Sequence, residues 1–369
     1  MKPAYTINPQ RLRRLLGRLL DIYSPSGKEE EVVQYVHQYL KRRGLPVIRQ
    51  EVDERRENLI VRPEGMGVQL ALIGHLDTVP AYELDDFGYE EDGDRIKGLG
   101  AADMKGGCAA MIEAFACLWE ACKGRIPLML ALVVGEEEEG DGAEHLIEDF
   151  RFPWALIGEP TGLDPCLSVY GYVAVQLTAK GQRLHASLAN RGRHAVEDLL
   201  KVLLSFLDFR DRQRPDLVYN IRDLFSSQTG FAVPEACEAW LDIHLPPETP
   251  LDRVTAEIEA LVARERQARP DIDLTVEFDT VQSGYILPEE GPVVDALKGA
   301  CLARDRVWRT SPFPSHSDAN QLWAAGVKPI VLGPGQLESA HRPDESISFD
   351  EVRTAAEIYL EIGRRLIPG

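Results

Sequence analysis

The hydrophobic pattern of this chain changes its period several times. Helical spacing of leucines over residues 9–22 predicts a first helix, and a second helical pattern covers residues 28–43. Short continuous apolar runs then alternate with further helical patterns. The runs cover residues 69–74, 127–134, 154–158 and 329–332, and the helical patterns cover 104–121 and 351–366, with Asp350 expected as the N-cap of the last. Continuous apolar strands between helices are typical of buried parallel sheets. We therefore predict an α/β fold with a mainly parallel sheet flanked by helices.

The middle of the chain has a different order of elements. Its pattern predicts a strand, a helix, two strands, a helix and a strand, over residues 168–180, 193–209, 217–224, 236–245, 251–267 and 272–279. Such a βαββαβ unit can fold as a small independent sandwich. We expect it to be inserted into the larger domain. The predicted domains are 1–166 with 281–369, and the inserted domain 167–280.

The composition of the chain indicates which classes of binding partner to exclude. The 369 residues contain 41 Lys and Arg against 60 Asp and Glu, which gives a formal net charge of −19. Such an acidic chain repels phosphate backbones, so nucleic acid is not expected as a partner. No apolar run approaches the roughly 20 residues of a membrane span, and the N-terminus lacks the apolar segment of a secretory signal. The six cysteines form no Cys-x-x-Cys pair. We expect a cytoplasmic protein with reduced cysteines and no membrane partner.

Acidic residues and histidines follow the predicted strands. They are His75 and Asp77 after the first run, Glu136 to Glu139 after the second, Glu159 after the third and His341 beyond the last. Asp103 lies where a glycine-rich loop enters a helix. Ligands of open α/β sheets bind beyond the carboxyl ends of the strands. These side chains are therefore expected at one edge of the sheet.

Crowded carboxylates repel one another and would take up protons unless cations neutralise them. Two Zn²⁺ ions would add four positive charges, and they match His nitrogen and carboxylate oxygen. The five proposed ligands are His75, Asp103, Glu137, Glu159 and His341, with Asp103 bridging the two ions. Asp77 lies two residues from His75, on the same side of a strand, where it can orient the imidazole. Glu136 is placed to act as general base for a metal-bound water.

Each of these residues also has a purely structural interpretation. Asp103 could be the N-cap of a helix that begins at Met104. The run of glutamates could be a solvated acidic turn, and a single histidine at a strand end is often structural. Glu159 could be an exposed loop residue. These interpretations leave unexplained why all the residues coincide with strand ends and glycine loops.

Five ordered blocks resemble a known family. They are His75-Leu76-Asp77-Thr78-Val79-Pro80, Gly100–Gly107, Gly135-Glu136-Glu137, Gly158-Glu159-Pro160-Thr161, and Leu332–Gly335 with Ala340–Glu345. In order and spacing the chain resembles, from about residue 10 to 365, the co-catalytic zinc hydrolases that include acetylornithine deacetylase, succinyl-diaminopimelate desuccinylase and carboxypeptidase G. The C-terminal block is most similar to acetylornithine deacetylase.

The resemblance implies roles for the same residues. One metal ion would take His75, Asp103 and Glu159, and the other Asp103, Glu137 and His341. Zinc is the expected metal, and cobalt is possible. Glu136 would be the general acid and base. The inserted domain would be a lid that also forms a homodimer interface, with His185 reaching across the dimer towards the substrate carbonyl. The family also implies a place in amino-acid biosynthesis.

The chain departs from the family at several lid positions, among them Ala189 and His194, where Pro and Asn are common. Phe231 precedes Ala232-Val233-Pro234 where an Asn is common, and Asp242-Ile243-His244 replaces Asp-Ile-Arg. Both positions commonly contact the carboxylate of the substrate in this family, and His cannot reproduce the bidentate fork of Arg. The candidates for lining the substrate pocket are Arg183, Asn190, His244 and Ser317.

The expected activity is hydrolysis of the amide in an N-acylated amino acid or short peptide. A water bridging the two metal ions would lose its proton to Glu136 and attack the acyl carbonyl. One alternative is a dipeptidase or carboxypeptidase with the same dinuclear site. Outside the enzymes, the alternative is a non-catalytic protein that binds metal or peptide. That alternative predicts loss of the base or of ligands, and the sequence retains them all.

Overall fold

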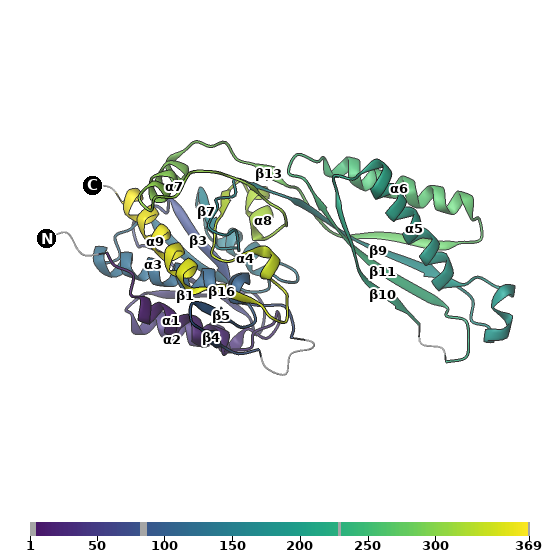
Figure 1. Ribbon diagram of the computed structural model, residues 1–369, viewed down its shortest axis with the longest axis horizontal. Helices are drawn as coiled ribbons and strands as arrows, with labels where there is room; N and C mark the ends of the chain where they lie inside the picture. Colours follow the sequence, from purple (N-terminus) through teal and green to yellow (C-terminus); the bar gives the residue numbers. More distant parts are fainter. Residues whose placement is uncertain (1–4, 82–86, 228–229, 368–369) are drawn as a thin grey trace. The chain divides into compact units, whose positions relative to one another are not determined.

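The computed structural model describes residues 5–81, 87–227 and 230–367 (Figure 1). Contacts divide the chain into two units. Unit 1 takes the residues up to Leu167, Leu287–Phe313 and the residues from Ser317 onwards, and unit 2 takes Ser168–Ile286 with Pro314–His316. Unit 2 is thus longer than the predicted insertion of residues 167–280. Strand β13 (Tyr285–Ile286) extends it, because β13 pairs with β8 (Ser168–Val169).

Unit 1 is built on a six-stranded sheet. Its order is β1 (Val47–Glu51), β2 (Glu57–Val61), β6 (Leu128–Val133), β3 (Leu70–His75), β7 (Trp154–Ile157) and β15 (Lys328–Val331). Strands β6, β3, β7 and β15 are parallel, whereas β2 is antiparallel to both β1 and β6. Every residue of β3 and β6 is buried. The continuous apolar runs therefore correspond to strands covered on both faces, and the predicted fold class is confirmed.

Strand β3 is the point in the unit 1 sheet from which the chain connections run in opposite directions. The chain runs from β3 through α3 (Gly106–Cys122) to β6, and from β6 through α4 (Asp141–Asp149) to β7 on the other side of β3. Because these connections run in opposite directions, right-handed crossovers put α3 and α4 on opposite faces. Residue His75 ends β3. It therefore lies at the point where open α/β sheets bind ligands.

The other elements of unit 1 complete its layers. Its further helices are α1 (Pro9–Leu20), α2 (Glu30–Arg42), α7 (Pro292–Leu302), α8 (Asp318–Ala324) and α9 (Phe349–Leu366), and its short strands are β4 (Glu90–Asp92), β5 (Arg95–Lys97), β14 (Pro312–Phe313) and β16 (Ser346–Ser348). Helix α9 packs against α3 and α7. The prediction of Asp350 as its N-cap is wrong. Ser348 is the N-cap, because it is extended and its side chain accepts a hydrogen bond from the backbone N–H of Glu351.

A close backbone contact holds α3 against the end of β7. The position of a Cβ on Gly107 would lie 2.2 Å from the carbonyl oxygen of Gly158. No side chain fits in that space without moving one of the two elements. Gly158 directly precedes Glu159, and Gly107 lies four residues after Asp103, so this contact joins the two segments that carry these acidic residues.

Gly107→Ala should therefore destabilise unit 1 by about 3 kcal/mol, since overpacking a buried contact forces backbone shifts. Thermal unfolding followed by circular dichroism measures the loss. Gly67→Ala is the matched control, because a Cβ there meets nothing within 4 Å. Equal melting temperatures for the two variants would show that the α3–β7 contact is not tight.

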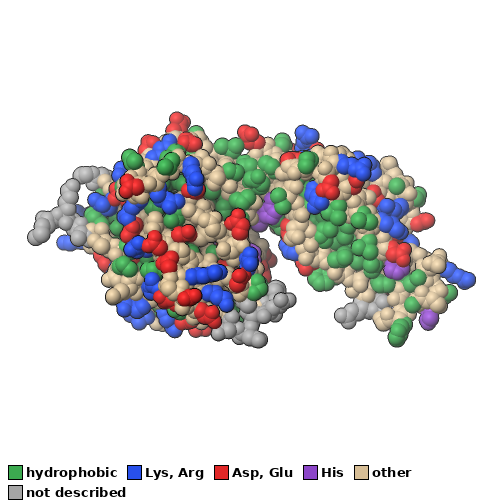
Figure 2. Space-filling view, viewed as in Figure 1, with side chains coloured by type: hydrophobic (Ala, Val, Ile, Leu, Met, Phe, Trp, Pro, Cys, Tyr) green, Lys and Arg blue, Asp and Glu red, His purple; other side chains and the backbone are tan. Residues whose placement is uncertain are grey.

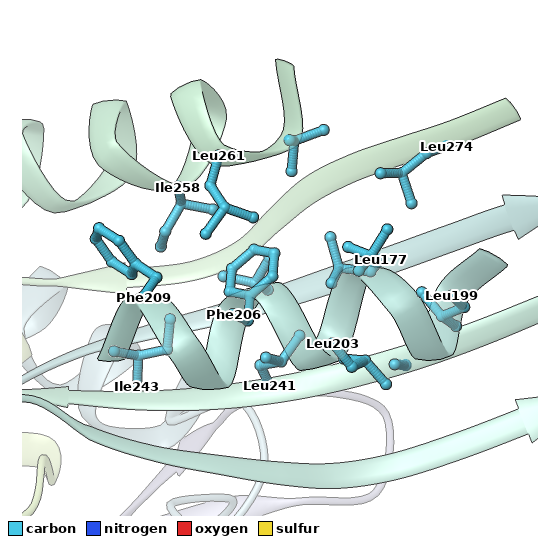
Figure 3. Packing of buried hydrophobic residues seen from close by; sticks show 14 of the residues in the cluster. Leu177, Leu199, Leu203, Phe206, Phe209, Leu241, Ile243, Ile258, Leu261 and Leu274 are labelled. Carbon is cyan, nitrogen blue, oxygen red and sulfur yellow. The ribbon is translucent and has the colours of Figure 1, made fainter. Parts of the chain in front are cut away.

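Unit 2 is an antiparallel sheet covered by two helices. The strand order is β10 (Val218–Ser226), β11 (Ala236–Leu245), β9 (Gly171–Lys180) and β12 (Asp273–Gln282). Helices α5 (Ala195–Gln213) and α6 (Leu251–Ala268) pack on one face, around a core that includes Leu177, Phe206, Leu241 and Ile258 (Figure 3). The observed order is the predicted βαββαβ. Among the described residues of the whole chain, no helix has the length and apolar character needed to cross a membrane.

Candidate metal centre

The carboxyl end of β3 carries the first group of candidate ligands. His75 is 1% exposed. Its Nε2 lies 3.2 Å from Asp103 Oδ1 and 3.7 Å from Glu159 Oε1. Glu159 follows Gly158 just beyond the end of β7, and β7 is next to β3 in the sheet. The structure thus brings three predicted ligands together around one point.

Asp103 owes its position to an irregular entry into α3. It lies in a turn over Ala101–Lys105, where its backbone leaves the helical region at φ −119° and ψ 97°. Helix α3 begins only at Gly106, without a side-chain cap. Asp103 is therefore not an N-cap, and its side chain is free to face the histidines. Gly100, with φ +78°, permits the tight turn that precedes it.

The second group shares Asp103 with the first. His341 Nε2 lies 3.0 Å from Glu137 Oε2 and 3.6 Å from Asp103 Oδ2. Burial disfavours the charged imidazole of His341, but the hydrogen bond to Glu137 and the negative charges of Glu137, Asp103 and Glu345 together outweigh burial and raise the pKa of His341 to about 9. The two oxygens of Asp103 thus face different histidines. This is the arrangement that a carboxylate bridging two cations requires.

Asp77 contacts one residue from each of the two groups of candidate ligands. Its backbone carbonyl oxygen lies 3.1 Å from His75 Nδ1, within hydrogen-bond distance, and its Oδ1 lies 3.5 Å from the same nitrogen. Its Oδ2 accepts hydrogen bonds from Ser26 Oγ at 2.8 Å and from the backbone N–H of Glu137 at 3.0 Å. With Nδ1 facing Asp77, the Nε2 of His75 is directed towards Asp103 and Glu159. Asp77 therefore fixes the positions of a residue from each group.

The site contains more carboxyl groups than imidazole groups, so its acidic groups are not all neutralised by positive charges of the chain. Burial raises the pKa of Glu136 and of Glu159 well above their ordinary values. Burial, the largest single influence, opposes ionisation of Asp103, but the hydrogen bond from His75 and the charges of His75 and His341 together outweigh burial and lower the pKa of Asp103. Within the described residues, Glu159 Oε1 is buried without a hydrogen-bond partner. An electron-pair donor of this kind is suited to a cation.

The donor sets fit two divalent metal ions. His75, Asp103 and Glu159 offer three ligand atoms within 4.8 Å of one another, and so do Asp103, Glu137 and His341. Each set combines one imidazole nitrogen with carboxylate oxygens, which suits zinc and other first-row divalent metals. Glu136 belongs to neither set. Its Oε2 lies 3.8 Å from His75 Nε2, beside the shared carboxylate.

Two further acidic residues of this region had not been singled out from the sequence. Glu345 accepts hydrogen bonds from the backbone N–H groups of Gly100, Ala102 and Asp103 at 2.8–3.0 Å, and so holds the loop that carries Asp103. Asp318 is 3% exposed, and burial raises its pKa to about 7. Its negative charge in turn raises the pKa of Glu136. Glu345 stood within the C-terminal family block, whereas no sequence signal pointed to Asp318.

A third buried acid, Glu29, lies just before α2. It is fully buried, and neither carboxylate oxygen has a hydrogen-bond partner among the described residues. The Arg56 guanidinium lies 4.0 Å from its Oε1. Burial, with the charge of Asp77 adding to it, raises the pKa of Glu29 from 4.5 to about 7.

Glu29 should make the folded state less stable as the pH rises. Its folded pKa lies above the unfolded one, so its contribution is complete below pH 4.5 and is lost between pH 4.5 and about 7. That loss amounts to about 3 kcal/mol. Glu29→Gln should therefore unfold at a higher temperature than the wild type at pH 8, and at nearly the same temperature at pH 4.5. Glu31→Gln, at an exposed position of α2, is the control. An unchanged melting temperature of Glu29→Gln at pH 8 would contradict the expectation.

The remaining predicted site residues have other surroundings. Arg183, His185 and Asn190 are exposed in unit 2, and His185 Nδ1 lies 2.8 Å from Ser187 Oγ. His244 is half-buried on β11 of the same unit. All the candidate metal ligands belong to unit 1, so the roles of these unit 2 residues stay predictions.

Ser317 has a structural role. It is the N-cap of α8, where its Oγ accepts a hydrogen bond from the backbone N–H of Ala319 and its own N–H donates to Asn320 Oδ1. This capping box explains the contacts of the Ser317 side chain, and its place in the substrate pocket stays a prediction.

Comparison with known proteins agrees with this geometry. Residues 71–365 match the peptidase family M20/M25/M40. An acetylornithine deacetylase from Vibrio atlanticus (strain LGP32) is 27% identical over 349 residues, which cover 89% of each chain. A tripeptidase from Staphylococcus aureus is similar in structure with a TM-score of 0.80 and 19% identity, over 98% of this chain and 99% of that one. A dinuclear metal-binding peptidase of the M20 family from Bacillus subtilis gives a TM-score of 0.70 at 12% identity, over 97% and 98% of the two chains. The family match covers most of the sequence and includes every candidate metal ligand, so this chain belongs to peptidase family M20/M25/M40.

Proposed function

We propose that the protein is a dinuclear metallohydrolase that cleaves the amide bond of an N-acylated amino acid, as an acetylornithine deacetylase does. The observation that carries the proposal is Asp103, whose two oxygens face two separate histidine and carboxylate groups. The curated relative named acetylornithine deacetylase supports this reaction class. Zinc is the proposed metal, with cobalt as a substitute, because the donors are imidazole and carboxylate.

When bound, two divalent ions supply Lewis-acid chemistry, which polarises the acyl carbonyl and lowers the pKa of water. Residues of the chain accept and donate the protons. Glu136 accepts the proton of the attacking water and then passes it to the departing amine. Its buried position keeps the carboxylate basic enough for this transfer. Asp77 holds His75 in one orientation throughout. His185 is proposed to stabilise the negative charge that develops on the carbonyl oxygen.

A peptidase acting through the same residues is the second candidate function. The tripeptidase of similar fold favours it. A panel of N-acetyl amino acids, N-succinyl amino acids and dipeptides, tested with Zn²⁺ or Co²⁺, separates the two candidates. We expect cleavage of N-acetyl amino acids or their derivatives. If no substrate is cleaved above the rate of a Glu136→Gln variant, the chain is a non-catalytic binding protein and the proposal is wrong.

A homodimer formed through unit 2 is part of the proposal. Strand β10 is an edge strand that exposes Leu224 and Phe225, and α5 exposes Leu200 and Leu204 at 44% and 65%. Figure 2 shows hydrophobic side chains gathered on the visible face of unit 2. Exposed apolar edges favour pairing with another chain. Light scattering should give the mass of a dimer for the wild type and of a monomer for Leu204→Asp with Phe225→Lys. A monomeric wild type would contradict this.

The state of the cysteines bears on the cellular compartment of the protein. The six cysteines are free, and all except Cys122 are buried, as suits a reducing compartment. We propose a cytoplasmic location on that basis. A place in amino-acid biosynthesis rests on the acetylornithine deacetylase relatives.

A further inference from the structure

Two segments of unit 1 that carry candidate ligands are joined to each other. We call residues 341–345 the histidine segment, and residues 98–103, which end at the shared Asp103, the aspartate loop. Strand β16 follows the histidine segment and β5 lies just before the aspartate loop, and the two strands pair antiparallel (Figure 1). The backbone carbonyl of Glu345 then accepts a hydrogen bond from the N–H of Gly98 at 3.1 Å. The strand pairing thus continues into the residues next to the ligands.

The side chain of Glu345 adds three hydrogen bonds to this junction. It is 2% exposed. Its Oε1 accepts from the backbone N–H groups of Ala102 at 2.8 Å and Asp103 at 3.0 Å, and its Oε2 accepts from that of Gly100 at 2.9 Å. A carboxylate accepts on both oxygens, whereas a glutamine of the same shape would direct N–H donors at one of these groups. Glu345 thus holds the aspartate loop through both carboxylate oxygens, while its own backbone belongs to the histidine segment.

The second donor set, formed by Asp103, Glu137 and His341, depends on this junction. Two of its three ligands belong to the joined segments, and His341 Nε2 lies 3.6 Å from Asp103 Oδ2. The backbone of His341 has φ +58°, a left-handed conformation that residues other than glycine rarely adopt. Such a conformation persists where neighbouring contacts fix it. Glu345 provides one, because its N–H donates at 3.1 Å to the carbonyl of Arg342, the residue after His341.

The first donor set, formed by His75, Asp103 and Glu159, is held by the sheet. His75 ends β3 and Glu159 lies just beyond β7, and these two strands pair in parallel. Asp103 is the one ligand of this set that lies on the joined segments. Its Oδ1 also lies 3.2 Å from His75 Nε2, a contact in which Glu345 takes no part. Loss of the junction should therefore alter the spacing of Asp103 and His341, while His75 and Glu159 keep theirs.

We propose that Glu345 is a positioning residue that sets the spacing between Asp103 and His341, and thereby the affinity of the second donor set for its metal ion. This rests on the dinuclear site of the proposed function and adds the residue that determines how strongly one half of that site binds. Glu345 acts through the backbone of the aspartate loop and belongs to neither set of ligand atoms. The ion of the first donor set should bind independently of Glu345.

Titration with Co²⁺ tests the proposal. Chelator-treated wild type and Glu345→Gln are titrated at pH 8, by calorimetry and by the visible absorption of bound Co²⁺. That pH is used because burial raises the pKa of Glu345 to about 7, and the ionised form is the one with two acceptor oxygens. The wild type should bind two ions per chain. Glu345→Gln should bind one ion as tightly as the wild type and the other about tenfold more weakly, the usual effect of losing a residue that orients a ligand.

Further variants identify the weakened ion and separate positioning from folding. His341→Ala removes a ligand of the second donor set alone, so the absorption that it abolishes should be the absorption that Glu345→Gln loses at low Co²⁺. Glu338→Gln is the control, because Glu338 is exposed and lies shortly before the histidine segment, and it should bind both ions as the wild type does. Thermal unfolding of the metal-free proteins shows which variants are folded. If Glu345→Gln does not fold, Glu345→Asp replaces it. That variant keeps both acceptors on a side chain one methylene shorter and should weaken the second ion by about threefold.

The outcomes are distinct. Unchanged affinity for both ions in a folded Glu345 variant overturns the positioning role, and so does an equal loss for both ions, which would mean that Glu345 supports unit 1 as a whole. The role is also overturned if the weakened ion is not the one that His341→Ala removes. Wild-type protein that binds clearly fewer than one ion per chain overturns the dinuclear site, and the role of Glu345 with it. Two bound ions without amide hydrolysis overturn the proposed function, while the selective loss in Glu345→Gln still supports the positioning role.

Discussion

Glu136→Gln is expected to lower kcat by about 10³-fold while metal binding stays intact, because the amide cannot take up the proton of the attacking water. Glu136 lies outside both sets of ligand atoms, although its Oε2 is only 3.8 Å from His75 Nε2. Glutamine preserves the size of the side chain and removes only its basicity. KM should therefore change little compared with kcat.

The run of four glutamates supplies the control for this experiment. Glu138→Gln changes an exposed residue of the same turn and should leave kcat unchanged. Both variants are assayed at saturating substrate, and their metal content is measured by mass spectrometry. Near-wild-type turnover of Glu136→Gln, or an equal loss in Glu138→Gln, would show that the base has been assigned to the wrong residue.

Asp103→Asn should have an effect at least as large, because a neutral amide cannot bridge two divalent ions. Loss of one ion or of both removes several kcal/mol of charge stabilisation from the transition state, so kcat should fall by about 10³-fold or more. The loop itself should survive, since Glu345 holds it through backbone N–H groups and not through the Asp103 side chain.

Metal content distinguishes this variant from Glu136→Gln. Asp103→Asn should retain fewer ions per chain than the wild type after dialysis, whereas Glu136→Gln should retain the full number. Asp92→Asn, on the exposed strand β4, controls for the loss of an acidic side chain. Full metal content with near-wild-type turnover in Asp103→Asn would contradict the bridging role.

The sequence predicted the main strands and helices because buried positions in each element are occupied by apolar residues at a characteristic spacing. Strands β3 and β6 are covered on both faces, so they appear as unbroken apolar runs. The carboxyl ends of parallel strands meet at one edge, which made it possible to predict that His75 and Glu159 lie together. The βαββαβ order of unit 2 was visible for the same reason.

Other features depend on contacts between residues far apart in the sequence, and the spacing of apolar residues does not reveal them. The entry of α3 at Gly106 is set by the non-helical backbone of Asp103, which no propensity indicates. Asp318 is a single acid whose importance comes only from burial beside the site.

The number of metal ions per chain tests the central claim most directly. Chelator-treated protein is reconstituted with Zn²⁺, dialysed and analysed by inductively coupled plasma mass spectrometry together with its protein concentration. The shared Asp103 and the two donor sets predict two zinc ions per chain. Clearly fewer than one zinc ion per chain would contradict the dinuclear site and the hydrolysis proposed to depend on it.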